Sequence, residues 1–223
     1  MSSTTSRGLE TPNNNAQMLI ARPPRIITRL MPRFTWDLPA EGNKVYLTFD
    51  DGPTPDVTLR VLEHLKQYKA RATFFCLGRN VDHYPDIYQQ ILNEGHSSGN
   101  HTYSHLKGWG SRNKTYYDDI ELARNHIDST LFRPPYGRIK PSQVSEILKT
   151  YRIIMWSVLS IDYNRRVSGD QCVKNVTDNV QPGSIIVFHD SAKARKNLYF
   201  ALPRVLEYLN KKGYEMVAIP MGM

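Results

Sequence analysis

The chain has 223 residues, of which 40% are hydrophobic, and a formal net charge of +8 at pH 7. This length fits one large domain or two small ones, and no apolar run is long enough to span a membrane. The only cysteines, Cys76 and Cys172, exclude a disulfide framework and a cysteine-rich zinc site. No stripe of stacking aromatic residues accompanies the positive charge, so we expect no nucleic-acid partner.

Before the first clear strand the chain has two parts. Residues 1–17 are polar and rich in Asn, which is typical of a disordered tail or an added leader, with Met18 as a candidate native start. Residues 18–43 form a basic segment that we expect to pack on the domain that follows. Residues 18–36 carry four arginines and no acid, so they offer a weak contact to an anionic membrane or wall surface. Neither Met1 nor Met18 is followed by a secretory pattern, and localisation and oligomeric state stay open.

From Lys44 onward, short apolar runs alternate with helical patterns, which indicates one domain over 44–223. Strands are predicted over 45–49, 72–78, 131–137, 153–160, 184–190 and 214–219, and residues 95–101 are predicted to form a short strand or a loop. Helices are predicted over 56–68, 81–94, 115–128, 141–150, 169–180 and 197–212. This alternation predicts an α/β fold with about seven parallel strands joined by outer helices. A closed or nearly closed (β/α) barrel fits best, and periodicity alone leaves an open doubly wound sheet as the alternative.

The first strand ends on two adjacent acids, Asp50 and Asp51, ahead of a Gly52-Pro53 turn. A simple interpretation has one aspartate capping the next helix and the other in water. However, neighbouring strand residues point to opposite faces, so one carboxylate is expected to be buried. Two like charges repel, and burying them unpaired is costly. A metal ion nearby would remove that repulsion.

Candidate partners for such an ion are His101 and His105. On a helical turn this spacing places both imidazoles on one face, although most such pairs are surface histidines. Two imidazoles and one carboxylate leave an open position for water, as catalytic zinc sites do. A bound metal lowers the pKa of that water from ~15.7 towards ~7. The spacing does not say which aspartate holds the metal and which accepts the proton.

Three further candidates lie at predicted strand ends. Arg133 either holds an ionised aspartate by charge-assisted hydrogen bonds or ties down a loop. His189 is a candidate general acid, since imidazole titrates near neutrality, or else a core histidine. Asp162 either orients His189 or lies in a solvated turn. Because barrel active sites lie at the carboxyl ends of the strands, the coincidence of these residues favours an active site there.

Together these motifs resemble the polysaccharide deacetylases of carbohydrate esterase family four, the chitooligosaccharide deacetylase-like domain. The five motifs occur in the family's order over roughly residues 44–220, as "TFDDGP", "HTYSH", "RPPYG", "WSVLSIDY" and "IIVFHD". The resemblance implies an irregular (β/α) barrel, usually with seven strands. It also implies a substrate outside the cytoplasm, which suggests the cell envelope.

The resemblance implies a metal site and a base. Asp51, His101 and His105 would bind one divalent metal ion, with zinc as the first choice and cobalt or nickel as alternatives. Asp50 would be the general base, paired with Arg133.

The resemblance also implies the groups that complete the reaction. His189 would be the general acid, tuned by Asp162, and the backbone N–H of Tyr136 would help to stabilise the oxyanion. The implied reaction is metal-dependent hydrolysis of N-acetyl groups on an N-acetylglucosamine-containing glycan, either peptidoglycan or chitin-like, with release of acetate.

The fourth motif departs from the family pattern Asp-x-x-Asp-Trp. Leu159 replaces the first aspartate and Tyr163 replaces the tryptophan, while Val187 stands where a leucine of the fifth motif lines the acetyl-methyl pocket. These changes are expected to affect the groove that binds the substrate more than the groups that carry out the reaction. Two alternatives therefore stay open: a hydrolase of another acetyl ester or C–N bond, and a catalytically silent glycan-binding module.

Overall fold

The central strand of the fold is β1 (Lys44–Asp50), which is buried from Val45 to Asp50. It pairs in parallel with β2 (Ala72–Cys76) on one side and with β7 (Ile185–His189) on the other. Burial on both faces is typical of a parallel strand whose sheet is covered by helices. The computed structural model describes residues 21–221, so the predicted tail and Met18 lie outside the described residues.

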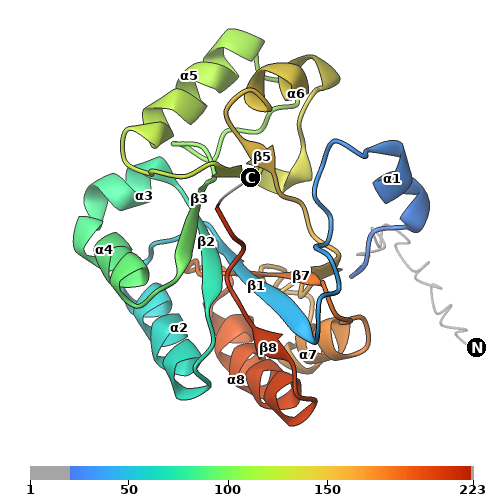
Figure 1. Ribbon diagram of the computed structural model, residues 1–223. Coiled ribbons are helices and arrows are strands. Elements are labelled where there is room, and N and C mark those ends of the chain that lie inside the picture. Colours follow the sequence, from blue (N-terminus) through green and yellow to red (C-terminus); the bar gives the residue numbers. More distant parts are fainter. Residues whose placement is uncertain (1–20, 222–223) are drawn as a thin grey trace, which may run out of the picture.

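All described strands belong to one curled sheet. Their order is β5-β4-β3-β2-β1-β7-β6, and β8 (Glu215–Met216) pairs with the start of β1. The other strands are short: β3 (Ser97–Asn100), β4 (Leu131–Phe132), β5 (Arg152–Ile153) and β6 (Val158–Leu159). The sheet forms a half-barrel with helices on its outside (Figure 1). This confirms the irregular (β/α) barrel over the doubly wound sheet, although the strand predicted over 153–160 is two strands at opposite edges.

The outer helices are α2 (Pro55–Gln67), α3 (Gly78–His83), α4 (Pro85–Asn93), α5 (Asn113–Arg124), α6 (Pro141–Ile147), α7 (Gly169–Thr177) and α8 (Arg195–Lys211). The single helix predicted over 81–94 is wrong. Pro85 lacks an N–H and disfavours a helical residue before it, so Tyr84 is non-helical (φ −131°, ψ 55°) and separates α3 from α4.

The main core lies between the sheet and these helices. Phe49 of β1 stacks on Phe74 of β2 and Phe188 of β7, with ring centroids 5.1 and 6.1 Å apart. Since side chains alternate along a strand, Thr48 and Asp50 face the interior of the barrel. Residues from α2 and α8, such as Leu62 and Leu202, complete the same cluster.

The segment before β1 fills the seam between the edges of the sheet. The Thr35 N–H donates to Ile153 O at 2.9 Å, and the Leu38 N–H donates to Gly183 O at 2.9 Å. Trp36 is buried between these contacts. In contrast, α1 (Arg25–Leu30) buries none of its residues and stands at the side of the barrel (Figure 1). The basic segment predicted over 18–43 therefore packs on the domain through residues 35–38 and not through α1.

The C-terminal segment crosses the end of the barrel at which β2 and β3 begin (Figure 1). The Ile219 N–H donates to Thr73 Oγ1 at 2.8 Å, and Ser97 Oγ donates to Ile219 O at 3.1 Å. A cleft is therefore left at the other end, where the strands finish. None of the helices within residues 21–221 has the length and apolar character needed to cross a bilayer.

Candidate active site

A cleft of about 530 Å³ opens at the carboxyl ends of the strands. It is lined by Asp50, Asp51, His101, His105, Pro134, Tyr136, Gly137, Arg138, Trp156, Leu159, Tyr163, Val187, His189 and Lys193. The other two predicted site residues, Arg133 and Asp162, are buried and contact Asp50 and His189. The fold therefore brings all the predicted site residues together.

Asp50 ends β1 inside the barrel and is held by Arg133, which is completely buried. Arg133 Nη1 donates to Asp50 Oδ1 at 2.6 Å and to Thr48 Oγ1 at 2.8 Å. Its Nε and Nη2 donate to the carbonyl oxygens of Ile154 and Met155, at 3.2 and 3.0 Å. Burial lowers the pKa of Arg133, and the charge of Asp50 opposes that shift. These four hydrogen bonds fix the position of the Asp50 carboxylate.

Asp51 leaves the strand with a φ of +82°, in the left-handed region that non-glycine residues rarely adopt. Its carbonyl oxygen accepts a hydrogen bond from Asn80 Nδ2 at 2.7 Å. The carboxylate faces two histidines, with Oδ1 3.2 Å from His105 Nε2 and 3.8 Å from His101 Nε2. The turn thus directs the Asp51 carboxylate towards the histidines, while Asp50 is paired with Arg133. The repulsion expected between adjacent aspartates is reduced in this way.

The two histidines lie in a loop after β3, so the helical turn expected for them is wrong. Thr102 and His105 both have positive φ, 66° and 65°, and this loop brings the rings of His101 and His105 to 5.2 Å. His101 Nδ1 is 2.7 Å from Arg133 O. Because a carbonyl only accepts, Nδ1 carries the proton and Nε2 keeps its lone pair for a ligand. Burial lowers the pKa of His101 to about 4, so this imidazole is neutral at pH 7.

These three residues fit a single divalent cation. One ligand atom from each of Asp51, His101 and His105 lies within 4.8 Å of the others. Asp51 Oδ1 is buried, and it has no hydrogen-bond partner among residues 21–221, which is costly for an uncompensated acceptor. Burial raises the pKa of Asp51, but the contact with His105 and the charge of His189 bring it below its usual range. A carboxylate with two imidazoles suits zinc and neighbouring transition metals.

His189 ends β7 at the level of Asp50 on the adjacent strand. Asp162 holds it twice: Oδ2 accepts from the His189 backbone N–H at 2.9 Å, and Oδ1 lies 2.8 Å from Nδ1. Burial lowers the pKa of His189, but the charge and hydrogen bond of Asp162 outweigh it and raise the pKa to about 9. The imidazole is therefore protonated at pH 7. Tyr163 packs edge-on against it, with centroids 4.8 Å apart.

Tyr136 stands in the short turn Pro135–Gly137 (η1), with φ 61° and ψ 9°. Tyr136 is 63% exposed, and the centre of its ring lies 4.7 Å from that of His105, at the edge of the cleft. The next residue must be glycine, because Gly137 has a φ of +64° and a Cβ there would lie 2.7 Å from Trp156. The "RPPYG" motif thus sets one wall of the cleft.

Sequence reasoning missed Asp190, which is completely buried beneath the turn that carries Asp51. Its Oδ1 accepts from the Gly52 N–H at 3.0 Å, and its Oδ2 accepts from the Thr58 hydroxyl at 2.6 Å. A Cβ on Gly52 would lie only 1.9 Å from Asp190 Oδ2. Asp190 directly follows His189 at the end of the same strand, and this position could have indicated from the sequence that it belongs to the site. Arg138 also lines the cleft, but its position in the sequence does not indicate this.

Comparison with known proteins agrees with this geometry. A family model described as polysaccharide deacetylase matches residues 37–153. The chain belongs to the polysaccharide deacetylase family. This family member is 34% identical over 192 residues to a peptidoglycan-N-acetylglucosamine deacetylase of Bacillus cereus, covering 83% of this chain and 90% of the relative.

One further relative and one solved structure are also similar to this chain. A chitooligosaccharide deacetylase of Azorhizobium caulinodans is 31% identical over 198 residues, which cover 80% of this chain and 93% of that relative. The solved structure of the Bc1960 peptidoglycan N-acetylglucosamine deacetylase matches with a TM-score of 0.79 and 33% identity, over 86% of this chain and 94% of that one. The assignment to carbohydrate esterase family four made from the five motifs is confirmed.

The residues that depart from the family pattern all line the cleft of this family member. Leu159, Tyr163 and Val187 contribute to its wall, beside Trp156. Leu159 is half-buried and is the last residue of β6, in register with Val187 of β7. The departures therefore alter the shape of the cleft and leave the Asp51, His101 and His105 cluster unchanged.

Proposed function

We propose that this chain is a metal-dependent deacetylase that removes N-acetyl groups from the N-acetylglucosamine residues of peptidoglycan. The observation that carries the proposal is that one cleft of about 530 Å³ combines three kinds of group. These are a carboxylate fixed by a buried arginine, a carboxylate with two imidazoles, and a histidine protonated at neutral pH. Amide hydrolysis needs a base, an electrophile and an acid, and these groups can supply all three. The relatives named as peptidoglycan deacetylases support the choice of substrate.

Asp51, His101 and His105 would hold one divalent cation, with zinc as the first choice. When bound, the cation supplies a Lewis acid that polarises the acetamide carbonyl and lowers the pKa of a water molecule. His101 is prepared for this role, since its Nδ1 is committed to Arg133 O and its low pKa keeps Nε2 unprotonated. We assign the catalytic domain to residues 44–223, with residues 34–38 completing its sheet.

The side chains of this chain then move two protons. Asp50, fixed by Arg133, accepts a proton from the attacking water as the water oxygen bonds to the carbonyl carbon. The Tyr136 N–H donates to the oxyanion that develops on the carbonyl oxygen. His189, held by Asp162, donates its proton to the amine nitrogen as the C–N bond breaks. One water and one N-acetyl group give acetate and a free amine.

The test is acetate release from peptidoglycan and from N-acetylglucosamine oligomers. Protein stripped with a chelator is resupplied with single divalent ions, and His105→Ala is run beside His83→Ala. His83 is exposed and does not line the cleft, so it is a matched control. We expect at least one ion to restore turnover in the wild type and in His83→Ala, and His105→Ala to lose roughly 100-fold or more. Equal activity of the two variants would overturn the metal assignment.

The altered fourth motif favours a second candidate, a glycan-binding module without turnover. Leu159 and Tyr163 change the wall of the cleft, and some members of the family are pseudoenzymes. This candidate predicts saturable glycan binding with no acetate under any ion. Acetate from an acetylated xylan but from no N-acetylglucosamine substrate would instead indicate an esterase on the same site.

A further inference from the structure

A second cleft, of about 620 Å³, lies beside the candidate active site and is strongly basic. Its lining includes five cations, Arg165, Arg166, Lys193, Arg195 and Lys196, and no acidic residue. All five are exposed, and none forms an ion pair within the part of the chain that the structure describes. Five like charges around one hollow repel one another and raise the local concentration of anions. We call this hollow the basic cleft.

The walls of the basic cleft are fixed by packing that does not involve the cations. Asn197 of α8 is buried, and its Nδ2 donates to the carbonyl oxygens of Asp162 and Val167 at 3.1 and 3.0 Å. These bonds tie the loop that carries Arg165 and Arg166 to α8. A Cβ on Gly169 would lie 2.4 Å from Phe200, so α7 and α8 approach closely at this point. The cleft is therefore a built feature of the fold.

The start of α8 also breaks a local electrostatic rule. A helix N-terminus carries partial positive charge and favours acidic residues. Yet α8 begins with Arg195 and Lys196, has no acid in its first turn and has no side-chain cap. By contrast, α7 begins with a Ser168 cap and carries Asp170 in its first turn. Since local rules are broken mainly at functional sites, the cations on α8 indicate that an anion from outside the chain compensates them.

The basic cleft meets the candidate active site at Lys193, which lines both. Lys193 Nζ is 5.5 Å from the centre of the Tyr163 ring, and Tyr163 packs on His189. One wall of the basic cleft is formed by residues that come shortly after Asp162 in the sequence, and the other by residues that come shortly after His189. If one sugar of a polymer lies at His189, the groups attached to the neighbouring sugar would therefore lie close to these cations.

We propose that the basic cleft binds the peptide carboxylates that a peptidoglycan strand carries beside the sugar to be deacetylated. The proposal rests on the function proposed above and adds a reason for selectivity. Peptidoglycan bears peptide carboxylates on alternate sugars, whereas chitin-type oligomers are uncharged. Arginine and lysine bind carboxylates by charge-assisted hydrogen bonds, so the cleft complements the first polymer and offers nothing to the second.

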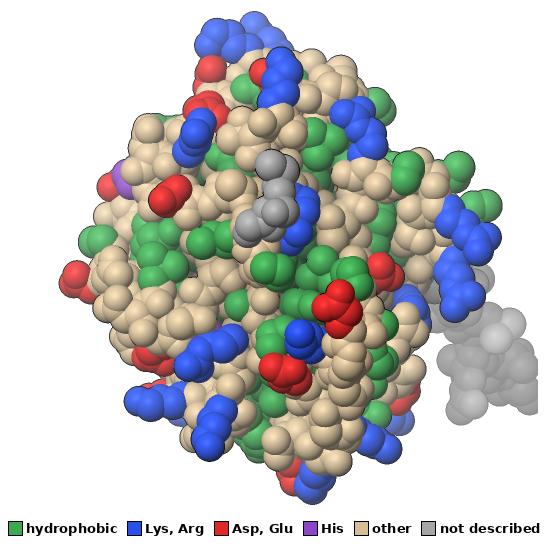
Figure 2. Space-filling view, viewed as in Figure 1, with side chains coloured by type: hydrophobic (Ala, Val, Ile, Leu, Met, Phe, Trp, Pro, Cys, Tyr) green, Lys and Arg blue, Asp and Glu red, His purple; other side chains and the backbone are tan. Residues whose placement is uncertain are grey.

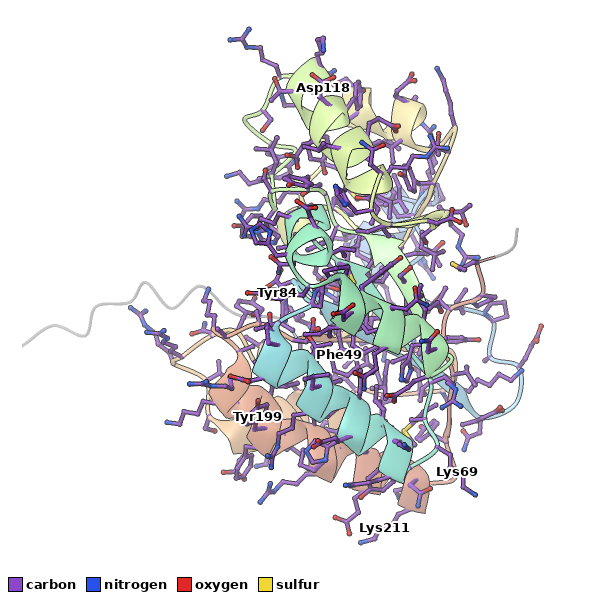
Figure 3. All side chains as sticks on the ribbon, turned by 90° about the vertical axis from the view of Figure 1, so that its left-hand side faces the viewer. Phe49, Lys69, Tyr84, Asp118, Tyr199 and Lys211 are labelled. Carbon is purple, nitrogen blue, oxygen red and sulfur yellow. The ribbon has the colours of Figure 1, made fainter. Side chains whose placement is uncertain are left out.

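The test uses the triple variant Arg166→Gln/Arg195→Gln/Lys196→Gln, which keeps Lys193 because that residue also lines the active-site cleft. The control, Lys66→Gln/Lys69→Gln/Lys212→Gln, removes the same charge from the far end of α2 and α8. Figure 3 shows Lys69 and Lys211 at that end, away from Tyr199 near the start of α8. Three substrates are compared: a peptidoglycan fragment with its stem peptides, the same fragment with its carboxylates converted to methylamides, and an uncharged N-acetylglucosamine oligomer.

We expect the wild type and the control to prefer the fragment with free carboxylates, mainly through a lower KM. The triple variant should lose roughly tenfold in kcat/KM on that fragment alone, so that the preference disappears. A preference equal to that of the wild type, or an equal loss on all three substrates, would overturn the proposal.

A binding measurement tests the basic cleft independently of the proposed deacetylase activity. If the wild type releases no acetate, the affinity of a fluorescent peptidoglycan fragment is measured for the same proteins. A roughly tenfold weaker affinity of the triple variant alone supports the basic cleft even when the deacetylase assignment fails. An effect on a glycerol phosphate polymer, with none on the carboxylate fragment, would assign the cleft to a phosphate polymer and refute the proposal.

Discussion

Arg133 and Asp50 form an ion pair inside the barrel, with Nη1 2.6 Å from Oδ1 and both side chains almost completely buried. The backbone carbonyl of the same arginine accepts from His101 Nδ1 at 2.7 Å. Arg133 therefore positions the candidate base with its side chain and a candidate metal ligand with its main chain.

Replacing Arg133 with methionine should strongly destabilise the fold, because it leaves the Asp50 carboxylate buried without its partner. Breaking a buried ion pair in this way lowers the free energy of unfolding by about 3–5 kcal/mol. Urea denaturation of Arg133→Met measures the loss. The double variant Asp50→Asn/Arg133→Met should recover part of it, since no unpaired charge remains. A single variant as stable as the wild type would show that this pair contributes little.

The contact between His189 and Asp162 predicts a pH-dependent stability. Burial lowers the pKa of His189, but Asp162 raises it from 6.5 to about 9. The folded state therefore binds a proton that the unfolded state loses between these values. The resulting stability is complete below about pH 6.5 and is lost as the pH rises through about 9. In the chelator-treated protein, this group should contribute about 3 kcal/mol to that decline.

The measurement is the free energy of unfolding at several pH values for the wild type and two variants. Asp162→Asn should show a much flatter profile over this range, because the amide removes the charge that raises the pKa of His189. His83→Ala should keep the wild-type slope, since His83 is exposed and has no carboxylate partner among the described residues. Equal slopes in the wild type and in Asp162→Asn would contradict the prediction.

Asp190 should affect metal binding without contacting the metal. Its carboxylate accepts from the Gly52 N–H and the Thr58 hydroxyl, and so fixes the turn after Asp51. We expect Asp190→Ala to weaken metal affinity roughly tenfold, as measured by competition with a chromogenic chelator. Asp190→Asn retains an oxygen for Gly52 and should retain most of the affinity. An alanine variant with wild-type affinity would assign Asp190 to stability alone.

The exposed face of α1 predicts binding to an anionic membrane. Ile26 and Leu30 are 67% and 76% exposed, and each follows or adjoins an arginine in the sequence of α1. Hydrophobic and basic side chains lie together on the side of the molecule where α1 stands (Figure 2). A basic amphipathic segment binds anionic vesicles through apolar burial and charge. Replacing Arg22, Arg25, Arg29 and Arg33 with Gln should reduce co-sedimentation with anionic vesicles, as should added salt. Unchanged binding would refute this prediction, and neutral vesicles provide the control.

Much of the fold and site was readable from the sequence, because the first and last motifs end strongly patterned apolar strands. Val45, Leu47 and Phe49 give the alternation that places Asp50 at a strand end, and parallel strands bring their carboxyl ends together. The division of labour between Asp50 and Asp51 was not readable. It depends on the φ of +82° at Asp51, which no pattern of residue types indicates.

Other features were missed because they depend on the path of a loop. A spacing of four between His101 and His105 fits a helical turn, yet positive φ values at Thr102 and His105 achieve the same approach without one. The basic cleft joins Arg165 and Arg166, which precede α7, to Lys193, Arg195 and Lys196 at the start of α8, and the spacing along the chain does not indicate that these two groups meet. The structure shows that both groups line one cleft, and the hydrogen bonds of Asn197 hold their two segments together.

The seam filled by residues 35–38 determines where this protein can be shortened. Thr35 bonds to Ile153 of β5, and Leu38 bonds to Gly183, which precedes β7. A version that begins at Lys44 would keep every motif of the cleft but would expose unpaired backbone groups at these two places. Exposed sheet edges recruit strands from other molecules, so such a version would aggregate during expression. Residues 35–38 carry no catalytic motif, yet they close the seam of the barrel.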